Sequence, residues 1–434
     1  MVSRQSVCLR RLADGRAQEV QFGRWLANRK VKPDALLANA YARTAAVAAG
    51  RHVLAIQDTS ELNYQAHVAR VSGLGTVGNG SDAGMFVHPL LAVDAADGTC
   101  LGLAHLHQWN RMGKADPDYR RLPIEDKESY RWLEVAQAGK QCLREAAMVT
   151  VVADRESDIY EEWARLPDAR THLLTRACRD RSLAGGGKLY AWLDAQPVQG
   201  HLEFDVPARP GKRTAHRARL SVRYGRIAIK RPDSCSDPAA PKQIELSVIE
   251  VKELPDSVIG NEAPIHWRLM TTHPITCFED AVRCVGWYRQ RWHIEQLFRT
   301  LKKQGLKIES SQVETAQGLS KLVCLAVQAA VRILQLTLAR DGGNGAPISS
   351  VFDAQEIKIL QHILPTLEGK TQKQKNPHQP GSLAQAVWVV ARLGGWKGYA
   401  SEAKPGPITM LHGLQRFEAI CNGWHLFAGD LCID

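Results

Sequence analysis

The sequence predicts an α/β protein with a sheet core, a β-rich insertion and a helical C-terminal region. Two compact apolar runs, His52–Gln57 and Met148–Ala153, have the length and composition of buried strands. Apolar and basic residues alternate over 200–231, as they do in strands with one buried face. Stretches at both ends of the chain are typical of helices, and together these three features place the protein in the α/β class.

The charge of the chain predicts affinity for a polyanion. Its 434 residues include 56 Lys and Arg against 45 Asp and Glu, a net charge of +11. This excess does not say which polyanion is bound, and a basic soluble enzyme would have the same composition. The ten cysteines form no CxxC pair, which makes zinc-finger and disulfide frameworks weak hypotheses and a reducing cytoplasm the default. The N-terminus lacks the apolar run of a signal peptide.

The remaining elements follow from pattern and composition. A loop is expected over 64–84, where glycine and serine are frequent. Leu322–Leu338 is interrupted by polar residues, so it predicts a buried helix rather than a membrane span. Further strands are predicted at Met85–Val93, Cys100–His107, His172–Arg176 and Trp267–Thr271, helices over 122–146, 155–165, 278–304, 311–340 and 383–428, and a polar linker over 369–382.

The segment from Arg209 to Arg231 contains nine cations and no acid. Alternation with apolar residues suggests a β-ribbon whose basic side faces a phosphate backbone, with a hairpin turn at Tyr224–Arg226. A merely solvated basic face explains the pattern equally well. The cations are Arg209, Lys212, Arg213, Arg217, Arg219, Arg223, Arg226, Lys230 and Arg231.

Both buried strands end at an aspartate, Asp58 after the first and Asp154 after the second. Chemistry in α/β sheets sits just beyond strand ends, and two acids delivered there can share divalent metals. For either aspartate alone, capping of the following turn is the commoner explanation.

A third acid lies on a patterned helix. Tyr288, Arg291, Glu295 and Lys302 are separated by three, four and seven residues, so about 3.6 residues per turn brings them onto one helix face. A solvated face with Arg291 paired to Glu295 is the usual explanation of such a stripe. Flanking apolar residues bury the other sides of this helix, which favours a polar stripe that faces a site.

Other candidate residues give weaker evidence for a functional role. His105 and His107 share a strand face but lack a third metal ligand at suitable spacing, so a packed pair is expected. Glu61 and Asp158 are expected to be capping or salt-bridged groups. No GxxxxGK[ST] phosphate loop is present, which argues against nucleotide hydrolysis.

These motifs together resemble a known family. The spacing Y-x2-R-x3-E-x6-K, preceded by LAIQDTS and VVADRESDIY, is similar to the signature of the insertion-sequence-four family of bacterial DDE transposases. Weaker similarity covers most of residues 24–426. The resemblance implies an RNase H-like core with a β-strand insertion, and a C-terminal region that makes a homodimer in a synaptic complex.

The resemblance also implies roles for single residues. Asp58, Asp154 and Glu295 match the catalytic acids that hold two Mg²⁺ or Mn²⁺ ions for phosphoryl transfer. Matches to residues that contact the DNA end are Tyr288, Arg291, Lys302, Arg176 and Trp267, the last stacking on a flipped base. The partners implied are double-stranded transposon ends and target DNA, in the bacterial cytoplasm at the nucleoid. For the basic segment from Arg209 to Arg231, the resemblance favours a DNA-binding ribbon over a solvated face.

The expected reaction is cut-and-paste transposition by strand nicking, hairpin formation, hairpin opening and strand transfer. Only 57 residues precede Asp58, fewer than the family's end-recognition domain usually has, so part of that domain is expected to be missing. A transposition inhibitor that acts by dimerisation and a metal-dependent nuclease that does not transpose are the alternatives. The expected organisation is an N-terminal DNA-end-binding region 1–50, a core in two parts 51–178 and 276–345, a basic insertion 179–275, a linker region 346–382 and a dimerisation region 383–434.

Overall fold

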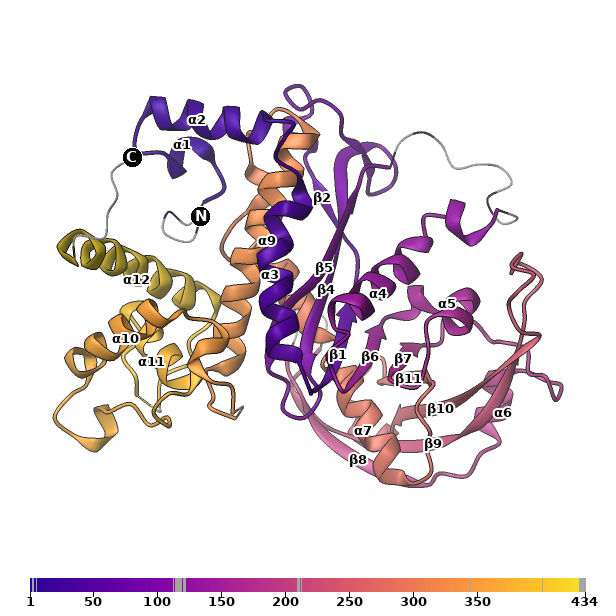
Figure 1. Cartoon of the computed structure of the whole chain (residues 1–434). Coiled ribbons are helices and arrows are strands. Elements are labelled where there is room, and N and C mark those ends of the chain that lie inside the picture. Colours follow the sequence, from indigo (N-terminus) through magenta and orange to yellow (C-terminus); the bar gives the residue numbers. More distant parts are fainter. Residues whose placement is uncertain are drawn as a thin grey trace.

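A computed structural model gives the fold of the protein (Figure 1). It describes all residues except 2–3, 5, 112, 114–118, 120–121, 209–210, 212, 344, 400 and 429–434. A single mixed sheet runs through the described part in the order β2-β4-β1-β6-β7-β11-β10-β9-β8, with β3 and β5 also paired to β4. The strands are β1 (His52–Gln57), β2 (Ser60–Asn63), β3 (Gly75–Val77), β4 (Asp82–Asp94), β5 (Cys100–Trp109), β6 (Met148–Ala153), β7 (Thr171–Arg176), β8 (Gly200–Val206), β9 (His216–Lys230), β10 (Gln243–Glu253) and β11 (His266–Thr271).

The centre of the sheet is parallel, and its flanks are antiparallel. β1 pairs with β6, and β6 with β7, in parallel register, whereas β4 runs antiparallel to β1 and β5 antiparallel to β4. The strands β1 and β6 are largely apolar because both faces of the sheet are covered, as their sequences predict. The predicted strands His52–Gln57 and Met148–Ala153 are confirmed to the residue.

Helices cover the two faces differently. Leu54 and Ile56 of β1 pack in one core cluster with α7 (Phe278–Arg289), α8 (Trp292–Lys302) and α9 (Ala316–Ala339). Val53 and Ala55, which point the other way, pack with α4 (Tyr130–Cys142) and α5 (Tyr160–Arg165). The aspartates that follow β1 and β6 therefore lie between two helical layers.

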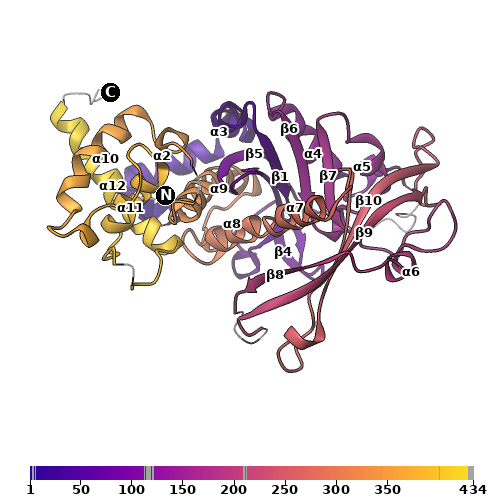
Figure 2. The same ribbon diagram turned by 90° about the horizontal axis from the view of Figure 1, so that it is seen from below.

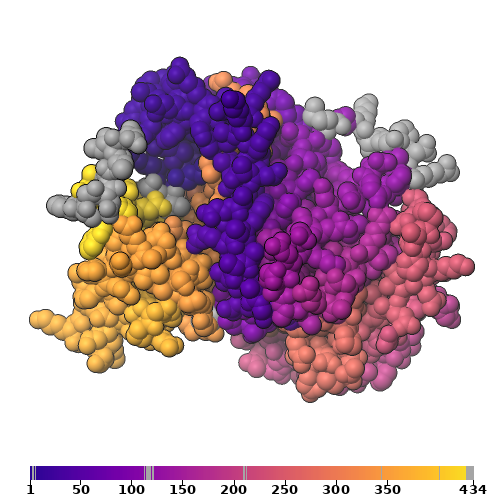
Figure 3. Space-filling model, viewed as in Figure 1, coloured from indigo at the N-terminus to yellow at the C-terminus, as the bar shows by residue number. Residues whose placement is uncertain are grey.

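The helices at both ends of the chain meet around α9. The N-terminal helices α1 (Leu9–Leu12), α2 (Arg16–Ala27) and α3 (Pro33–Ala48) precede β1, and α3 packs on β5 and α9. In the space-filling view the indigo N-terminal residues form a column between the sheet and the orange C-terminal helices (Figure 3). These C-terminal helices are α10 (Ala354–Leu367), α11 (Leu383–Leu393) and α12 (Pro407–Ala428), which share a third core cluster with the end of α9.

Several predicted elements differ from the structure. The helix predicted over 122–146 covers only α4, and that predicted over 155–165 is a 3-10 turn, η4 (Arg155–Ser157), followed by α5. The 64–84 loop contains β3 and the start of β4. The segment 346–382, predicted as a linker region, contains α10, whose Ile359 and Leu360 are buried in the C-terminal core. The three residues of β3 carry little pattern, whereas α10 has helical apolar spacing at Ile357, Leu360 and Leu364 that the linker prediction overlooked.

The predicted hairpin turn at Tyr224–Arg226 is wrong. β9 runs straight through Gly225, with Tyr224 and Arg226 paired to Ile249 and Ser247 of β10. A Cβ at Gly225 would lie 2.6 Å from the ring of Trp192 in α6 (Leu189–Asp194). The glycine therefore admits a tryptophan against the strand rather than turning the chain.

The long helix predicted over 278–304 is also wrong as a single element. It breaks at Gln290 and Arg291 into α7 and α8, which follow one another along one side of the sheet (Figure 2). Helix α9, the one described helix long and apolar enough to cross a membrane, has 72% of its apolar window buried in the fold. It is a core helix, as the sequence predicted.

Candidate active site

Sheet topology brings the two aspartates to the same edge. β1 and β6 are parallel neighbours, with Ile56 opposite Val152, so Asp58 and Asp154 leave the sheet side by side. Each caps its own turn: one oxygen of Asp58 accepts from the Thr59 amide and one of Asp154 from the Glu156 amide, both at 2.8 Å. Capping uses one carboxylate oxygen of each residue, and the other oxygen of Asp58 is bound by Arg291.

The helix break places Arg291 between two of the predicted acids. Arg291 is the first residue before α8, and its Nη1 lies 2.8 Å from Asp58 Oδ2. Its Nη2 lies 3.6 Å from Glu295 Oε1, one turn along the helix. The pairing of Arg291 with Glu295 that the sequence suggested is present, but the stronger contact is the one to Asp58.

The protonation of Asp58 reflects this crowding. Burial is the main cause that raises the pKa of Asp58 to about 7, and the nearby charges of Asp154 and Glu295 raise it further, while Arg291 lowers it. The negative charges of both other acids thus disfavour the ionised form of Asp58. Such a carboxyl gains from any cation that replaces its lost hydration.

Three further predicted residues lie at the same edge. Arg176 ends β7, and Trp267 is the second residue of the antiparallel β11, whose Leu269 pairs with Arg176. The ring of Trp267 meets that of Tyr288 edge-on at 5.4 Å, and Nη2 of Arg176 donates to the His266 carbonyl at 2.9 Å. Burial raises the pKa of the Tyr288 phenol, so it stays protonated. The sheet and the end of α7 thus gather residues that are far apart in sequence.

Lys302 lies at the far end of α8. Its Nζ donates to the Glu61 carbonyl at 2.8 Å and lies 3.3 Å from Glu309. The break between α7 and α8 separates it from Tyr288, so the four-residue stripe is not one continuous helix face. Lys302 borders the site through β2 rather than through Asp58.

The ligand chemistry of the three acids fits a hard divalent cation, but their placement needs adjustment. Among the described residues, no group of three or more His, Cys, Asp or Glu side chains is gathered closely enough to hold a metal. Arg291 occupies the Asp58 oxygen that would serve as a ligand. Carboxylate oxygens are what Mg²⁺ requires, so the donor set fits once Arg291 leaves Asp58.

A buried chain of hydrogen bonds, missed at the sequence level, joins the two aspartate motifs. Arg131 Nε donates to Thr59 Oγ1 at 3.0 Å, and Thr59 Oγ1 lies 2.7 Å from His88 Nδ1. His88 Nε2 lies 3.1 Å from Gln57 Oε1, and Gln57 Nε2 donates to Glu162 at 3.3 Å. Because Thr59 accepts from Arg131, its hydroxyl proton is available for His88, which leaves Nε2 of His88 protonated for Gln57.

The same chain continues into the second motif. Ser157 Oγ, in the turn after Asp154, donates to Glu162 Oε2 at 2.7 Å. Arg131 also reaches this turn through Glu156, at 2.9 Å. Burial raises the pKa of Glu162 to about 8, so this carboxyl is mostly protonated at neutral pH. A glutamine at the end of an apolar strand and an acid beside Trp163 were the only sequence signals for this network.

The lesser candidates are structural groups. Asp158 is buried against Arg181, with Oδ1 2.8 Å from Arg181 Nε, and its Oδ2 accepts from the Cys178 amide. Glu61 Oε2 accepts from the Gly78 amide at 2.8 Å. His105 stacks on Tyr41, and His107 packs beside Trp109. These placements agree with the capped, salt-bridged and packed groups that the sequence predicted.

Acids pair with most of the described cations of the ribbon, whereas no ion pair among the described residues involves Lys230 or Arg231. Arg217 pairs with Glu203 of β8 at 2.8 Å, Arg223 with Glu250 of β10 at 2.8 Å, and Arg226 with Glu245 of β10. Further pairs join Arg213 to Glu262 and Arg219 to Asp256, and Arg231 donates to the Ala240 carbonyl. Arg209 and Lys212 lie outside the described residues. A solvated, internally paired face describes this ribbon better than a phosphate-binding one.

Part of the chain matches a known protein-family model. Residues 136–332 match the family model of the transposase DDE domain. The match supports a DDE transposase. The matched transposase domain contains Asp154 and Glu295, while Asp58 precedes its first residue.

Among solved structures, the chain is similar to a piggyBac transposase in a synaptic complex with hairpin DNA. The TM-score is 0.33 and the identity 10%, over 68% of this chain and 53% of that one. The chain therefore spans about half the length of the solved structure that it matches.

Proposed function

We propose that this protein is a cut-and-paste DNA transposase whose catalytic acids are Asp58, Asp154 and Glu295. The observation that supports the proposal is the parallel pairing of β1 with β6, which brings Asp58 and Asp154 side by side, together with Arg291, which lies 2.8 Å from Asp58 and 3.6 Å from Glu295. The family match over residues 136–332 supports the same reaction class. The reactions would be nicking of the transposon end, hairpin formation, hairpin opening and strand transfer.

An RNase H-like core is the corresponding proposal for the fold. The order β5-β4-β1-β6-β7, with the first three strands antiparallel and the last three parallel, supports it. The segment β8–β11 would then be an insertion that extends this core between β7 and α7. This arrangement accounts for acids that arrive from two strands and one helix.

The three carboxylates would hold two Mg²⁺ or Mn²⁺ ions. When bound, these ions activate a water or a 3′-hydroxyl and steady the leaving oxygen of an in-line displacement. Arg291 would leave Asp58 and turn to a DNA phosphate, because it cannot neutralise both. The chain of hydrogen bonds from Arg131 to Glu162 would keep the two aspartate turns in register.

The same edge offers contacts for DNA. Arg176, Arg291 and Lys302 would neutralise phosphates near the cleaved bond, and Tyr288 would position the end. Trp267, half-buried beside Tyr288, would stack on a base that leaves the duplex, a contact worth about 1–3 kcal/mol. The partners would be the terminal inverted repeats and target DNA, in the cytoplasm at the nucleoid.

A homodimer is part of this proposal. Helix α12 exposes large apolar side chains, among them Ile420, Trp424 and Leu426, the last 65% exposed. Apolar groups along one terminal helix are suited to pairing with a second copy. The C-terminal helices would in this way hold two chains in one synaptic complex.

Cleavage and joining of the element's terminal repeats test the function. We expect the purified protein with Mg²⁺ to cut a terminal repeat and to join pre-cut ends to a plasmid. D58N, D154N and E295Q should each lower both rates by about 100-fold or more while DNA binding persists. D256N, which removes an exposed ribbon acid, is the matched control and should retain activity.

The other outcomes of these assays would identify the alternative functions or a wrong triad. Cutting without joining would identify a nuclease. Binding to an active partner without cutting would identify an inhibitor. Undiminished cleavage by D58N and E295Q would show that the triad is misassigned.

A further inference from the structure

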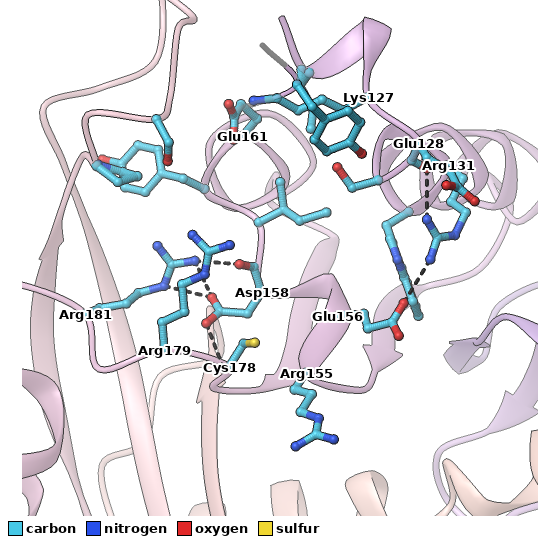
Figure 4. Close-up of a pocket in the computed structure, with 18 of the residues that line it drawn as sticks. Lys127, Glu128, Arg131, Arg155, Glu156, Asp158, Glu161, Cys178, Arg179 and Arg181 are labelled. Atoms are coloured by element: carbon cyan, nitrogen blue, oxygen red, sulfur yellow. Dashed lines mark hydrogen bonds and ion pairs between the residues drawn. The ribbon is translucent and has the colours of Figure 1, made fainter. Parts of the chain in front are cut away.

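A basic cavity lies beside the second aspartate motif, on the α4 face of the sheet (Figure 4). Its volume is about 680 Å³, and it lies between the start of α4, the turn η4 and the loop after β7. Six cationic and four acidic side chains line it: Arg111, Lys127, Arg131, Arg155, Arg179 and Arg181, with Glu128, Glu156, Asp158 and Glu161.

Only some of the cations that line this cavity form ion pairs with described acids. Arg111 pairs with Glu128, Arg131 with Glu156, and Arg181 with Asp158. Lys127, Arg155 and Arg179 form no ion pair with any described residue. Arg155 and Arg179 are exposed, and Lys127 is half-buried. Three cations of this lining thus have no acid partner among the described residues, and we call Lys127, Arg155 and Arg179 the unpaired cations.

A second cavity continues the basic surface. It has a volume of about 220 Å³ and shares Arg155 and Cys178 with the first. Arg176 and Arg268 line it, and none of its described lining residues is an acid. Arg155 lines both cavities and therefore connects Lys127 and Arg179 to the edge where Arg176 and Trp267 lie. The two cavities form one cationic path that passes the residue next to Asp154.

The first cavity lies on the opposite sheet face from α8. The core residues that pack with α4 and α5 form one cluster, and those that pack with α7, α8 and α9 form another on the other face of the sheet. Arg291 and Lys302 thus approach the acids from one side and the unpaired cations from the other. Strand transfer requires two DNA segments at one centre, so a second binding face is a geometric requirement of the proposed function.

We propose that Lys127, Arg155 and Arg179 bind the phosphate backbone of a second DNA segment, beyond the end held by α8. Cations without protein partners release counterions from DNA, whereas paired ones release few. The segment would be B-form duplex, either the flanking DNA of the donor or the target. This inference rests on the proposed function for its biological meaning, but the binding itself can be measured without catalysis.

The test is the salt dependence of binding to a random-sequence duplex, followed by fluorescence anisotropy. The triple variant K127Q/R155Q/R179Q should reduce the slope of log affinity against log salt by about 2 to 3. The matched control R217Q/R219Q/R226Q removes the same charge from the ribbon, where each arginine has an acid partner, and should reduce it by less than 1. Charge-conserving K127R/R155K/R179K should restore the original slope.

Equal losses in the two triple variants, or none in the first, would overturn the proposal. Thermal unfolding of each variant confirms that the fold is kept. Two assays then separate the sources of DNA: slower cutting of flanked ends indicates the donor flank, and slower joining of pre-cut ends indicates the target. Because anisotropy needs no catalysis, a protein that never transposes can still confirm or refute the binding site.

Discussion

The ribbon β8–β10 and the edge that carries the aspartates are both rich in arginine, but they use it in opposite ways. On the ribbon, Arg217, Arg223 and Arg226 meet acids on the neighbouring strands. At the edge, Arg155 and Arg179 meet none among the described residues, and Arg291 bridges acids that repel one another. Local charge density is therefore a poor guide to DNA binding, because strand pairing decides which cations remain unpaired.

The largest expected effect is on the stability of the ribbon. Glu250 is 1% exposed and binds Arg223, His266 and Arg268 together. E250Q should lower the free energy of unfolding by about 3 kcal/mol, because it leaves clustered cations without a partner. Glu245 lies on the same strand as Glu250 and forms an exposed ion pair with Arg226, so E245Q should lower the free energy of unfolding by less than about 1 kcal/mol. Urea unfolding measures both, and equal effects would refute the distinction between buried and exposed pairs.

A buried histidine beside the sheet core and a histidine on the ribbon should change protein stability with pH in opposite directions. His273 packs on His172 and near His52, and it forms no ion pair with any described acid. Burial is the main cause that lowers its pKa to about 3. Asp94, Asp168 and Arg283 are the charged groups that act on this cluster. The unfolded chain binds the proton near pH 6.5 and the folded chain does not, so stability falls with pH below that value, by about 2 kcal/mol at pH 5 from His273.

His216 on the ribbon should behave oppositely. Its pKa is raised by the Thr214 carbonyl and by Glu253, so its stabilisation is complete below about pH 6.5 and is lost as pH rises through the folded value. Thermal unfolding between pH 5 and 8 should show that H273Q flattens the loss in acid and that H216Q deepens it. The same profile for both variants would contradict the assignment.

A smaller effect is expected for a cation at the edge that does have partners. R131Q would remove the bond to Thr59 and the ion pair to Glu156, which loosens the register of the two aspartate turns. The rate of end cleavage should fall by about ten-fold with unchanged DNA affinity, because one positioning contact is worth about 1.4 kcal/mol. R111Q, which lines the same cavity but pairs with Glu128, should leave the rate unchanged. A change in affinity rather than rate would make Arg131 a DNA contact.

The smallest effect should come from unmasking a ribbon cation. E245Q leaves Arg226 without its acid, which converts one paired cation into an unpaired one. The salt slope of duplex binding should steepen by about 1. An unchanged slope would mean that the ribbon faces away from DNA whatever its charge.

Much of the core could be predicted from local pattern. Continuous apolar runs identified β1 and β6 because parallel strands are buried on both faces. The break before α8 could not be predicted, because the sequence around Gln290 keeps helical periodicity on both sides. Gly225 was misread as a turn because the residue that requires it, Trp192, is distant in sequence.

By itself, the sequence determined the two aspartate-ended strands, the candidate acids and the overall excess of positive charge, since these depend on residue type and short-range order. Only the tertiary structure decided which charges meet. Glu203, Glu245 and Glu250 neutralise the ribbon from strands outside the basic window, and Arg131 joins two turns through Thr59 and Glu156. Pairing across strands depends on register and packing, which no local stretch of sequence encodes.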